Sequence, residues 1–124
     1  MDHLFPTYLT PRDGSTVALS ALGIKQFPGV DMTESERWES IAFNCSADTK
    51  IDAYGSEDGV TLDLSNTQAI TASTGAMSAG TRQRVAGQNL IAPYVIFVFT
   101  DISGVGGTLS NVVVWTRENV ASRA

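Results

Sequence analysis

The sequence predicts an all-β protein that folds as a single antiparallel β-sandwich of the jelly-roll type. Hydrophobic residues alternate with polar ones over short segments, and clusters of Gly, Asp and Ser separate these segments. No part of the 124 residues shows the sustained period of a long helix, so neither a helical bundle nor a parallel sheet is expected. A chain of this length forms one domain without needing a disulfide or a metal.

Residues 1–29 are expected to form an extended N-terminal arm in front of the sandwich. The arm contains Pro6 and Pro11, which lack a backbone donor, and residues 11–14 (Pro-Arg-Asp-Gly) are typical of a turn. Residues 15–24 alternate moderately, as a first strand would. A Thr-Glu-Ser-Glu capping box then predicts one or two helical turns over residues 33–38, with an irregular loop as the alternative.

The sandwich is expected over residues 30–117, followed by a polar C-terminal tail at residues 118–124. Its strands are predicted at residues 39–45, 50–54, 60–64, 68–73, 81–86, 93–100 and 108–116. Residues 93–100 are apolar on both faces, which indicates a central strand covered on both sides. Residues 81–86 have few apolar side chains and carry Arg82 and Arg84, which indicates an edge strand.

Two segments resemble discoidin-like jelly rolls. Residues 51–62 (IDAYGSEDGVTL) are similar to that family's strand–turn–strand motif Tyr-Ser-x-Asp-Gly-x-x-Trp, with Leu62 in place of the tryptophan. Residues 92–98 resemble its late Ala-Arg-Tyr-Val-Arg-Ile strand, with Pro93 and Ile96 in place of the arginines. A proline-bearing arm before a compact sandwich also resembles small virion proteins of tailed bacteriophages, which serve as capsid cement (decoration) or as head–tail and tail accessory parts.

The residue content argues against several classes of function. One cysteine, Cys45, and one histidine, His3, form neither an internal disulfide nor a His/Cys metal cage. A net charge of −5 with only 8 basic residues disfavours nucleic acid as a partner. No nucleophile has a base placed beside it, and residues 104–107 lack the Gly-Lys-Ser/Thr of a phosphate loop, so neither an enzymatic activity nor a cofactor is expected. The longest apolar run, residues 94–99, is too short to span a membrane.

Two kinds of binding site remain open alternatives. Carboxylates near one hairpin could bind Ca²⁺, although such residues usually accept hydrogen bonds from nearby backbone in turns. They are Asp48, Asp52, Glu57, Asp58 and Asp63. Four aromatic residues could form a sugar-stacking platform, although packing in the core is favoured for Tyr94 and Trp115. The four are Trp38, Tyr54, Tyr94 and Trp115.

Together these features predict a non-enzymatic structural protein of a virion, which binds and stabilises a phage capsid or a head–tail or tail assembly. Because no signal peptide is recognisable, synthesis in the host cytoplasm is expected before assembly. Expected partners are copies of itself, as a homo-oligomer such as a trimer, and neighbouring capsid or tail proteins. The predicted interface residues are Leu4, Phe5, Tyr8, Leu9, Arg82 and Arg84. The alternative is a carbohydrate-binding discoidin-like module that recognises host-surface glycans.

Overall fold

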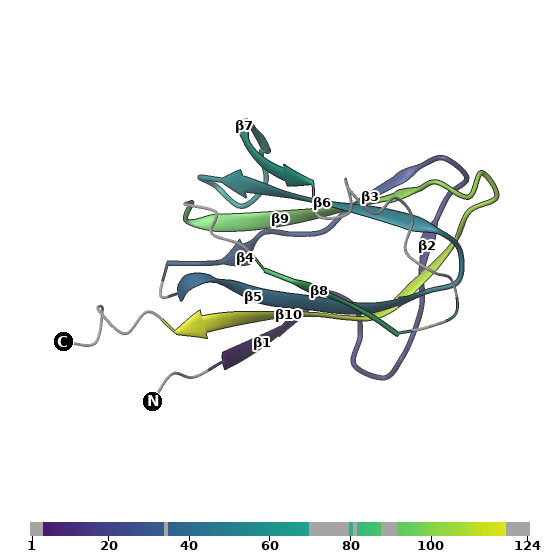
Figure 1. The fold of residues 1–124 in the computed structure, drawn as a ribbon, viewed down its shortest axis with the longest axis horizontal. Coiled ribbons are helices and arrows are strands. Elements are labelled where there is room, and N and C mark those ends of the chain that lie inside the picture. The colour runs from purple at the N-terminus through teal and green to yellow at the C-terminus, as the bar shows by residue number, and fades with distance from the viewer. Residues whose placement is uncertain (1–3, 34, 70–79, 81, 88–91, 119–124) are drawn as a thin grey trace.

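A computed structural model describes residues 4–33, 35–69, 80, 82–87 and 92–118, and within these ranges the chain forms ten strands. The strands make two antiparallel sheets that pack face to face, as the two layers of Figure 1 show. The prediction of a single antiparallel β-sandwich is therefore confirmed. Short runs of alternating side chains give each sheet one apolar face, and each face is buried against the other.

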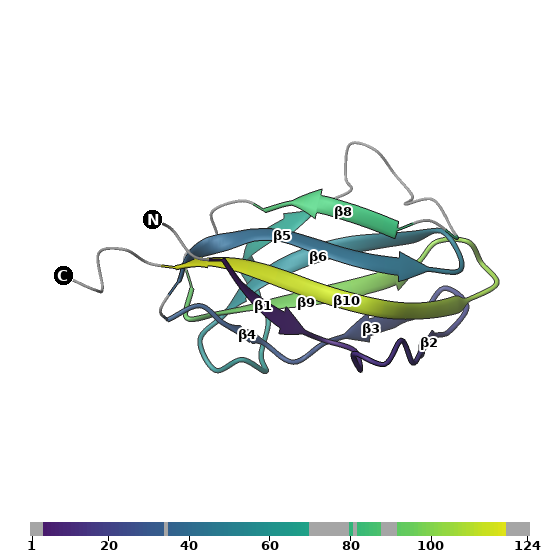
Figure 2. The same ribbon diagram turned by 90° about the horizontal axis from the view of Figure 1, so that it is seen from below.

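Sheet A has the strand order β1-β10-β5-β8, and β2 pairs with another part of β10. Its strands are β1 (Leu4–Tyr8), β2 (Val17–Leu19), β5 (Ser35–Cys45), β8 (Arg82–Ala86) and β10 (Gly107–Glu118). Sheet B has the order β3-β9-β6-β7, and β4 also pairs with β9. Its strands are β3 (Ile24–Gln26), β4 (Val30–Asp31), β6 (Thr49–Ser56), β7 (Asp63–Ala69) and β9 (Tyr94–Asp101). Figure 2 shows the long strands β5, β6, β9 and β10 running along the molecule.

The core lies between the sheets and is built on aromatic pairs. The ring centroids of Trp38 and Phe97 are 5.0 Å apart, and those of Phe43 and Phe99 are 5.1 Å apart, both in edge-to-face contact. All four side chains are fully buried. Each pair joins β5 of sheet A to β9 of sheet B, so these contacts hold the two layers together.

Strand β9 has neighbours on both sides and is buried on both faces. Phe97 points into the core, and Ile96 and Val98, which alternate with it, are also buried. Strand β6 pairs with β9 from Thr49 to Ser56, and β3 and β4 pair with its other side. The prediction of a central strand over residues 93–100 is confirmed.

The predicted arm is wrong for the residues that the structure describes between 4 and 29. Strand β1 pairs with β10 in a continuous register from Leu4↔Arg117 to Tyr8↔Val113. The single strand expected at residues 15–24 is divided between β2 of sheet A and β3 of sheet B, and Leu19 and Phe27 on this segment are buried. Proline does not prevent this pairing, because an edge strand tolerates a missing donor. The domain boundary expected at residue 29 therefore falls inside the sandwich.

The predicted helix at residues 33–38 is also wrong, because β5 begins at Ser35. The Thr33 hydroxyl, expected to cap a helix, donates to Asp31 Oδ1 at 2.7 Å, and the Thr33 amide donates to the same oxygen at 2.8 Å. Trp38 is buried in the core, and its strand pairs with β10 as far as Ser35↔Glu118. Burial of one large side chain and a long strand ladder outweigh the local helix signal.

The strand expected at residues 60–64 begins later than predicted, at Asp63. The Asp58 carboxylate accepts hydrogen bonds from the amides of Val60 and Thr61, at 2.8 and 2.7 Å, and so holds this part of the chain in a turn. The strands expected at residues 60–64 and 68–73 are not separate where the structure describes them, because β7 runs without a break from Asp63 to Ala69. The other five strand predictions are confirmed to within four residues. The start of the tail expected at residue 118 is wrong, because Glu118 ends β10. Residues 70–73 of the strand expected at 68–73, and the tail residues 119–124, lie outside the described residues.

The Asp101 carboxylate organises the end of β9. It accepts hydrogen bonds from the amide and hydroxyl of Ser103, from the amides of Gly104 and Gly106, and from the amide of Leu22 in the β2–β3 turn. These bonds, led by the Ser103 hydroxyl and the Leu22 amide, lower the pKa of Asp101 to about 2. The bond from Leu22 helps to hold that residue at a φ of 53°, which a leucine adopts at a cost.

Candidate interaction surface

The outer face of sheet A gathers exposed apolar, aromatic and basic side chains. On β10, Val112 and Val114 point into the core, so the alternating residues Val113 and Trp115 belong to the outer face. Directly paired residues share a face, and the register places Tyr8 of β1 opposite Val113 and Pro6 opposite Trp115. We call this surface, formed by β1, β10, β5 and β8, the A face.

The same register brings the edge strand β8 onto the A face. Ala42 of β5 pairs with both Val113 and Arg84, so these three residues form one row across the sheet with Tyr8. Arg82 lies one row away, opposite Asn44. Strand β8 lies at one edge of sheet A, as its composition predicted.

The arginines of the A face lie across the sheet. Nη1 of Arg82 donates to Asn44 Oδ1 at 2.7 Å and to the Asn111 carbonyl at 2.9 Å, which joins β8 to β5 and β10. Nη1 of Arg84 donates to the Ser40 hydroxyl at 3.3 Å. On the other side of the face, the guanidinium carbon of Arg12 lies 4.4 Å from the centre of the Tyr8 ring. The basic groups are thus already positioned on the surface.

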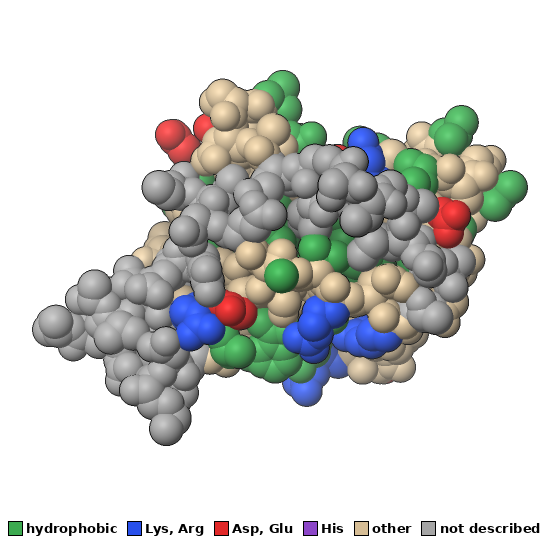
Figure 3. All heavy atoms as spheres, in the orientation of Figure 1, with side chains coloured by type: hydrophobic (Ala, Val, Ile, Leu, Met, Phe, Trp, Pro, Cys, Tyr) green, Lys and Arg blue, Asp and Glu red, His purple; other side chains and the backbone are tan. Residues whose placement is uncertain are grey.

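A shallow hollow of about 310 Å³ lies on the A face. Its lining combines one aromatic ring, two guanidinium groups, one amide and one aliphatic side chain. They are Tyr8, Arg12, Arg82, Asn111 and Val113. Asn111 has a φ of 50° at an irregularity in the β10–β5 register. Asparagine tolerates this conformation better than most residues. Figure 3 shows hydrophobic side chains between basic ones on this side of the molecule.

Basic residues are distributed unequally between the two sheets. Within the described part of the chain, every arginine lies in sheet A or in the connection after β1, whereas Lys25 and Lys50 lie in sheet B. Arg117 is paired with Glu39, with Nε and Oε2 2.8 Å apart. Among the residues whose side chains the structure describes, Arg12, Arg82 and Arg84 are exposed and contribute positive charge to the A face.

Sheet B carries an acidic segment that spans the connection from β6 to β7 and the first two residues of β7, which we call the acidic loop (residues 57–64). Glu57, Asp58 and Asp63 line a second shallow hollow of about 300 Å³, and Val60 and Leu64 are more than 70% exposed. Hydrogen bonds from the amides of Thr61 and Val60 hold the pKa of Asp58 well below its ordinary value. This carboxylate is therefore ionised at neutral pH.

The structure places four of the six predicted interface residues, Leu4, Tyr8, Arg82 and Arg84, on the A face. Phe5 pairs with Thr116, so its side chain belongs to the inner face of sheet A. It is still 46% exposed, because β1 is an edge strand. Leu9 packs against the core. That these residues make an interface stays a prediction.

Sequence reasoning did not find the contribution of Trp115, Arg12, Asn44 and Asn111 to this face. The core position favoured for Trp115 is wrong, because the side chain is only half-buried and belongs to the outer face. The alternation of Val112, Val114 and Thr116 carried the signal, because three buried positions spaced by two leave Trp115 outside. The contribution of Arg12 and the two asparagines depends on strand pairing.

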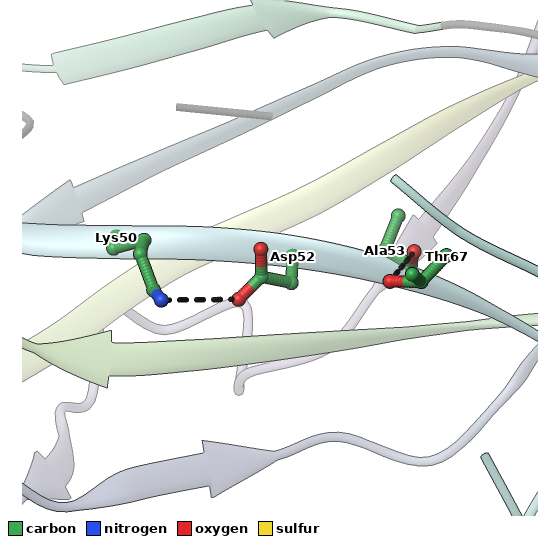
Figure 4. A network of polar contacts seen from close by, with 4 residues as sticks. All are labelled: Lys50, Asp52, Ala53 and Thr67. Carbon is green, nitrogen blue, oxygen red and sulfur yellow. Dashed lines mark hydrogen bonds and ion pairs between the residues drawn. The ribbon is translucent and has the colours of Figure 1, made fainter. Parts of the chain in front are cut away.

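Three of the candidate calcium ligands, Asp52, Asp58 and Asp63, are engaged with separate partners. Figure 4 shows the Lys50–Asp52 pair on β6, with Nζ and Oδ2 3.7 Å apart, beside the bond from the Thr67 hydroxyl to the Ala53 carbonyl. Asp63 accepts from the amide and hydroxyl of Ser65. Within the described ranges, no group of three or more His, Cys, Asp or Glu side chains is arranged to hold a metal ion.

The four candidate sugar-stacking residues do not share one surface. Trp38 is in the core, and Trp115 is on the A face. By their register with β9 and β6, Tyr54 and Tyr94 belong to the outer side of sheet B. Tyr94 packs against the turn at Gly59.

Cys45 is buried in the core, and this burial raises the pKa of its thiol. It therefore packs as a small apolar residue, as the strand pattern indicated. His3 lies outside the described residues. In the part of the chain that the structure covers, no helix has the length and apolar character needed to cross a membrane.

Comparisons with known proteins find a similar fold among solved structures and no related family or curated sequence. Neither the protein-family models nor the curated protein sequences compared with this chain give a match. Among solved structures, one of infectious bursal disease virus, Gt strain, is similar with a TM-score of 0.50 and 12% identity, over 94% of this chain and 32% of that chain. The low-affinity xylan-binding module CBM86 from Roseburia intestinalis is similar with a TM-score of 0.46 and 11% identity, over 98% of each chain. At 12% identity the likeness to the viral structure shows the fold alone.

Proposed function

We propose that this protein is a non-enzymatic structural component of a virion, located in a phage capsid or in a head–tail or tail assembly that it binds and stabilises through the A face. The observation that supports this proposal is the set of exposed apolar and aromatic side chains on that face, bordered by arginines. Leu4 and Tyr8 are 46% and 43% exposed. Contiguous apolar surface bordered by polar groups typically marks an interaction site.

The composition and order of the A face suit binding to protein. Tyrosine, tryptophan and arginine are enriched at protein interfaces, and all three occur here. Because Arg82 and Arg84 already donate to neighbouring strands, they lose less side-chain freedom when a partner binds. In an assembly the same contact is made by many copies, so a modest affinity for each copy is sufficient.

The second candidate is a carbohydrate-binding module, and the hollow on the A face favours it. One ring, Tyr8, stands beside guanidinium and amide groups, which is a combination able to stack on a sugar and bind its hydroxyls. Among the described residues, Tyr8 is the only aromatic side chain that lines the hollow. Protein binding uses the whole A face, including Leu4 and Trp115, and for that reason it is the proposal.

Removal of the two exposed apolar side chains tests the proposal. Leu4→Ser/Tyr8→Ser should abolish co-sedimentation with virion particles purified from the source, while the folded state persists by circular dichroism. Val105→Ser is the matched control, because Val105 is 81% exposed in the β9–β10 loop, away from the A face. The virion role would be refuted if the wild-type protein stayed in the supernatant while intact particles sedimented.

Affinity electrophoresis separates the two candidates. Gels containing xylan or polygalacturonate should leave the migration of the wild-type protein unchanged. Retardation that Tyr8→Ser removes, together with no attachment to particles, would overturn the proposal in favour of glycan binding.

A further inference from the structure

The A face and the acidic loop are complementary in charge and in apolar content. The A face offers Arg82 and Arg84 together with the exposed apolar side chains Leu4 and Tyr8, and Tyr8 lies in the same row as Arg84. The acidic loop offers Glu57 and Asp63 beside Val60 and Leu64, which are 73% and 72% exposed. Opposite charges next to exposed apolar side chains on both surfaces are typical of two surfaces that bind each other.

We infer that the A face of one copy of this chain binds the acidic loop of a second copy, so that the protein assembles head to tail. The inference rests on the proposed function and names its partner. In this contact Glu57 and Asp63 of one copy approach Arg82 and Arg84 of the next. Val60 and Leu64 cover the exposed Tyr8 side chain of the A face.

The contact has to form between molecules, because the two surfaces belong to different layers. The acidic loop leads into β7 at the edge of sheet B, and the A face is the outer side of sheet A (Figure 1). The core separates them within one chain. Figure 3 shows acidic and hydrophobic side chains at the upper left of the molecule and most of the visible basic side chains at the bottom.

Both surfaces are held in shape before binding. The Asp58 carboxylate organises the acidic loop from within. The loop is also tied to the rest of sheet B, because the Gly29 amide donates to the Gly59 carbonyl at 3.0 Å and Gln26 Nε2 donates to the Val60 carbonyl at 3.1 Å. Glu57 and Leu64 therefore sit on a fixed support, which lowers the entropy lost on association.

A contact between two different surfaces has a structural consequence. It leaves one A face and one acidic loop free at the ends of every open chain of copies. Such contacts close into a ring when the rotation between copies allows it, and otherwise extend as a filament. A ring or a short filament of small β-sandwiches suits a protein that surrounds or joins parts of a particle.

Variants that reverse one charge on the A face or one charge on the acidic loop test the contact. Sedimentation velocity over a range of concentrations should show self-association of the wild-type protein. Arg84→Glu should weaken it about tenfold, and so should Glu57→Lys, because each variant places like charges in the contact. An equimolar mixture of the two variants should regain association, since the Glu at position 84 of one then meets the Lys at position 57 of the other.

Two control variants carry the same charge changes at other places. Lys50→Glu matches Arg84→Glu in charge but lies on β6 of sheet B, and Asp48→Lys matches Glu57→Lys but lies in the β5–β6 turn. Both controls should associate as the wild-type protein does. Raising the salt concentration should weaken association of the wild-type protein, as expected for exposed charges.

The outcomes separate this contact from the proposed function. A mixture that stays dissociated, or controls that weaken association as strongly as the paired variants, would refute the head-to-tail contact. If the contact is refuted in this way while the wild-type protein still binds particles and Leu4→Ser/Tyr8→Ser does not, the virion role stands and only the contact fails. A wild-type protein that remains monomeric at millimolar concentration would also refute the contact.

Discussion

Strand β9 at the centre of sheet B and strand β8 at the edge of sheet A differ in what each side chain contacts. In β9, five consecutive residues from Val95 to Phe99 are buried, whereas in β8 exposed and half-buried residues alternate. The sequences show the same contrast, since VIFVF contains no polar side chain and RQRVA begins with three. A central strand contributes to stability through both faces, while an edge strand leaves one side for a partner.

The two strands therefore serve different purposes in one fold. Loss of a side chain from β9 removes contacts with both layers of the sandwich. Loss of a side chain from β8 changes the surface that another molecule meets. Substitutions at the two sites should separate stability from association, and the predictions below are ordered by the size of the effect on stability.

The largest effect is expected for Phe97→Ala in β9. Phe97 is fully buried and contacts the Trp38 ring edge to face, so truncation leaves a cavity between the sheets. The free energy of unfolding should fall by about 3–5 kcal/mol, measured by urea titration. A loss below about 1 kcal/mol would contradict the central role of β9.

Removal of residues 1–9 should have the next largest effect, because β1 is an edge strand of the sandwich and not a detached arm. The truncation removes the ladder with β10 and the packing of Leu9 against the core. The free energy of unfolding should fall by about 2 kcal/mol or more. An unchanged melting temperature would instead support a segment independent of the fold.

Asp101 at the end of β9 should make stability depend on acid pH. Its pKa in the folded protein is about 2, below the ordinary value of 3.8, so the folded state favours the ionised form. The resulting stability is present above about pH 4 and is lost as the pH falls toward about 2. The melting temperature of Asp101→Asn should be lower at neutral pH.

Comparison of the two proteins across pH isolates the contribution of this carboxylate. The difference in melting temperature between wild type and Asp101→Asn should shrink as the pH falls, because protonation removes from the wild type what the substitution removes from the variant. The comparison is needed because Asp13, Asp31 and Asp58 also have lowered pKa values and affect both proteins alike. A difference that is constant over this pH range would contradict the role of the ionised group.

The smallest effect on stability is expected for Arg84→Glu in β8. The side chain is exposed, and its bond to the Ser40 hydroxyl is long at 3.3 Å. The free energy of unfolding of the monomer should change by no more than about 0.5 kcal/mol in urea titration, as for most surface substitutions. A much larger loss would mean that Arg84 supports the sheet, and its effect on association would then need a milder variant such as Arg84→Gln.

The alternation of side chains in the sequence by itself determined the fold class, the central position of residues 93–100 and the edge position of residues 81–86. These features depend on which side chains are buried away from water. The order of apolar and polar residues within each strand already indicates this, without knowledge of the rest of the chain. The same pattern placed Cys45 in the core. It also indicated Arg82 and Arg84, which are exposed on the A face.

Only the tertiary structure decided where residues 4–29 and 33–38 belong and which side chains form one surface. Proline and capping signals are local and worth about 1 kcal/mol, whereas pairing with β10 and burial of Trp38 depend on residues far away in the chain. Tyr8 and Arg84 are 76 positions apart in the sequence. They lie on one face because their strands, β1 and β8, both belong to sheet A. Strand register is set by the packing of the whole core, so one strand's sequence does not reveal it.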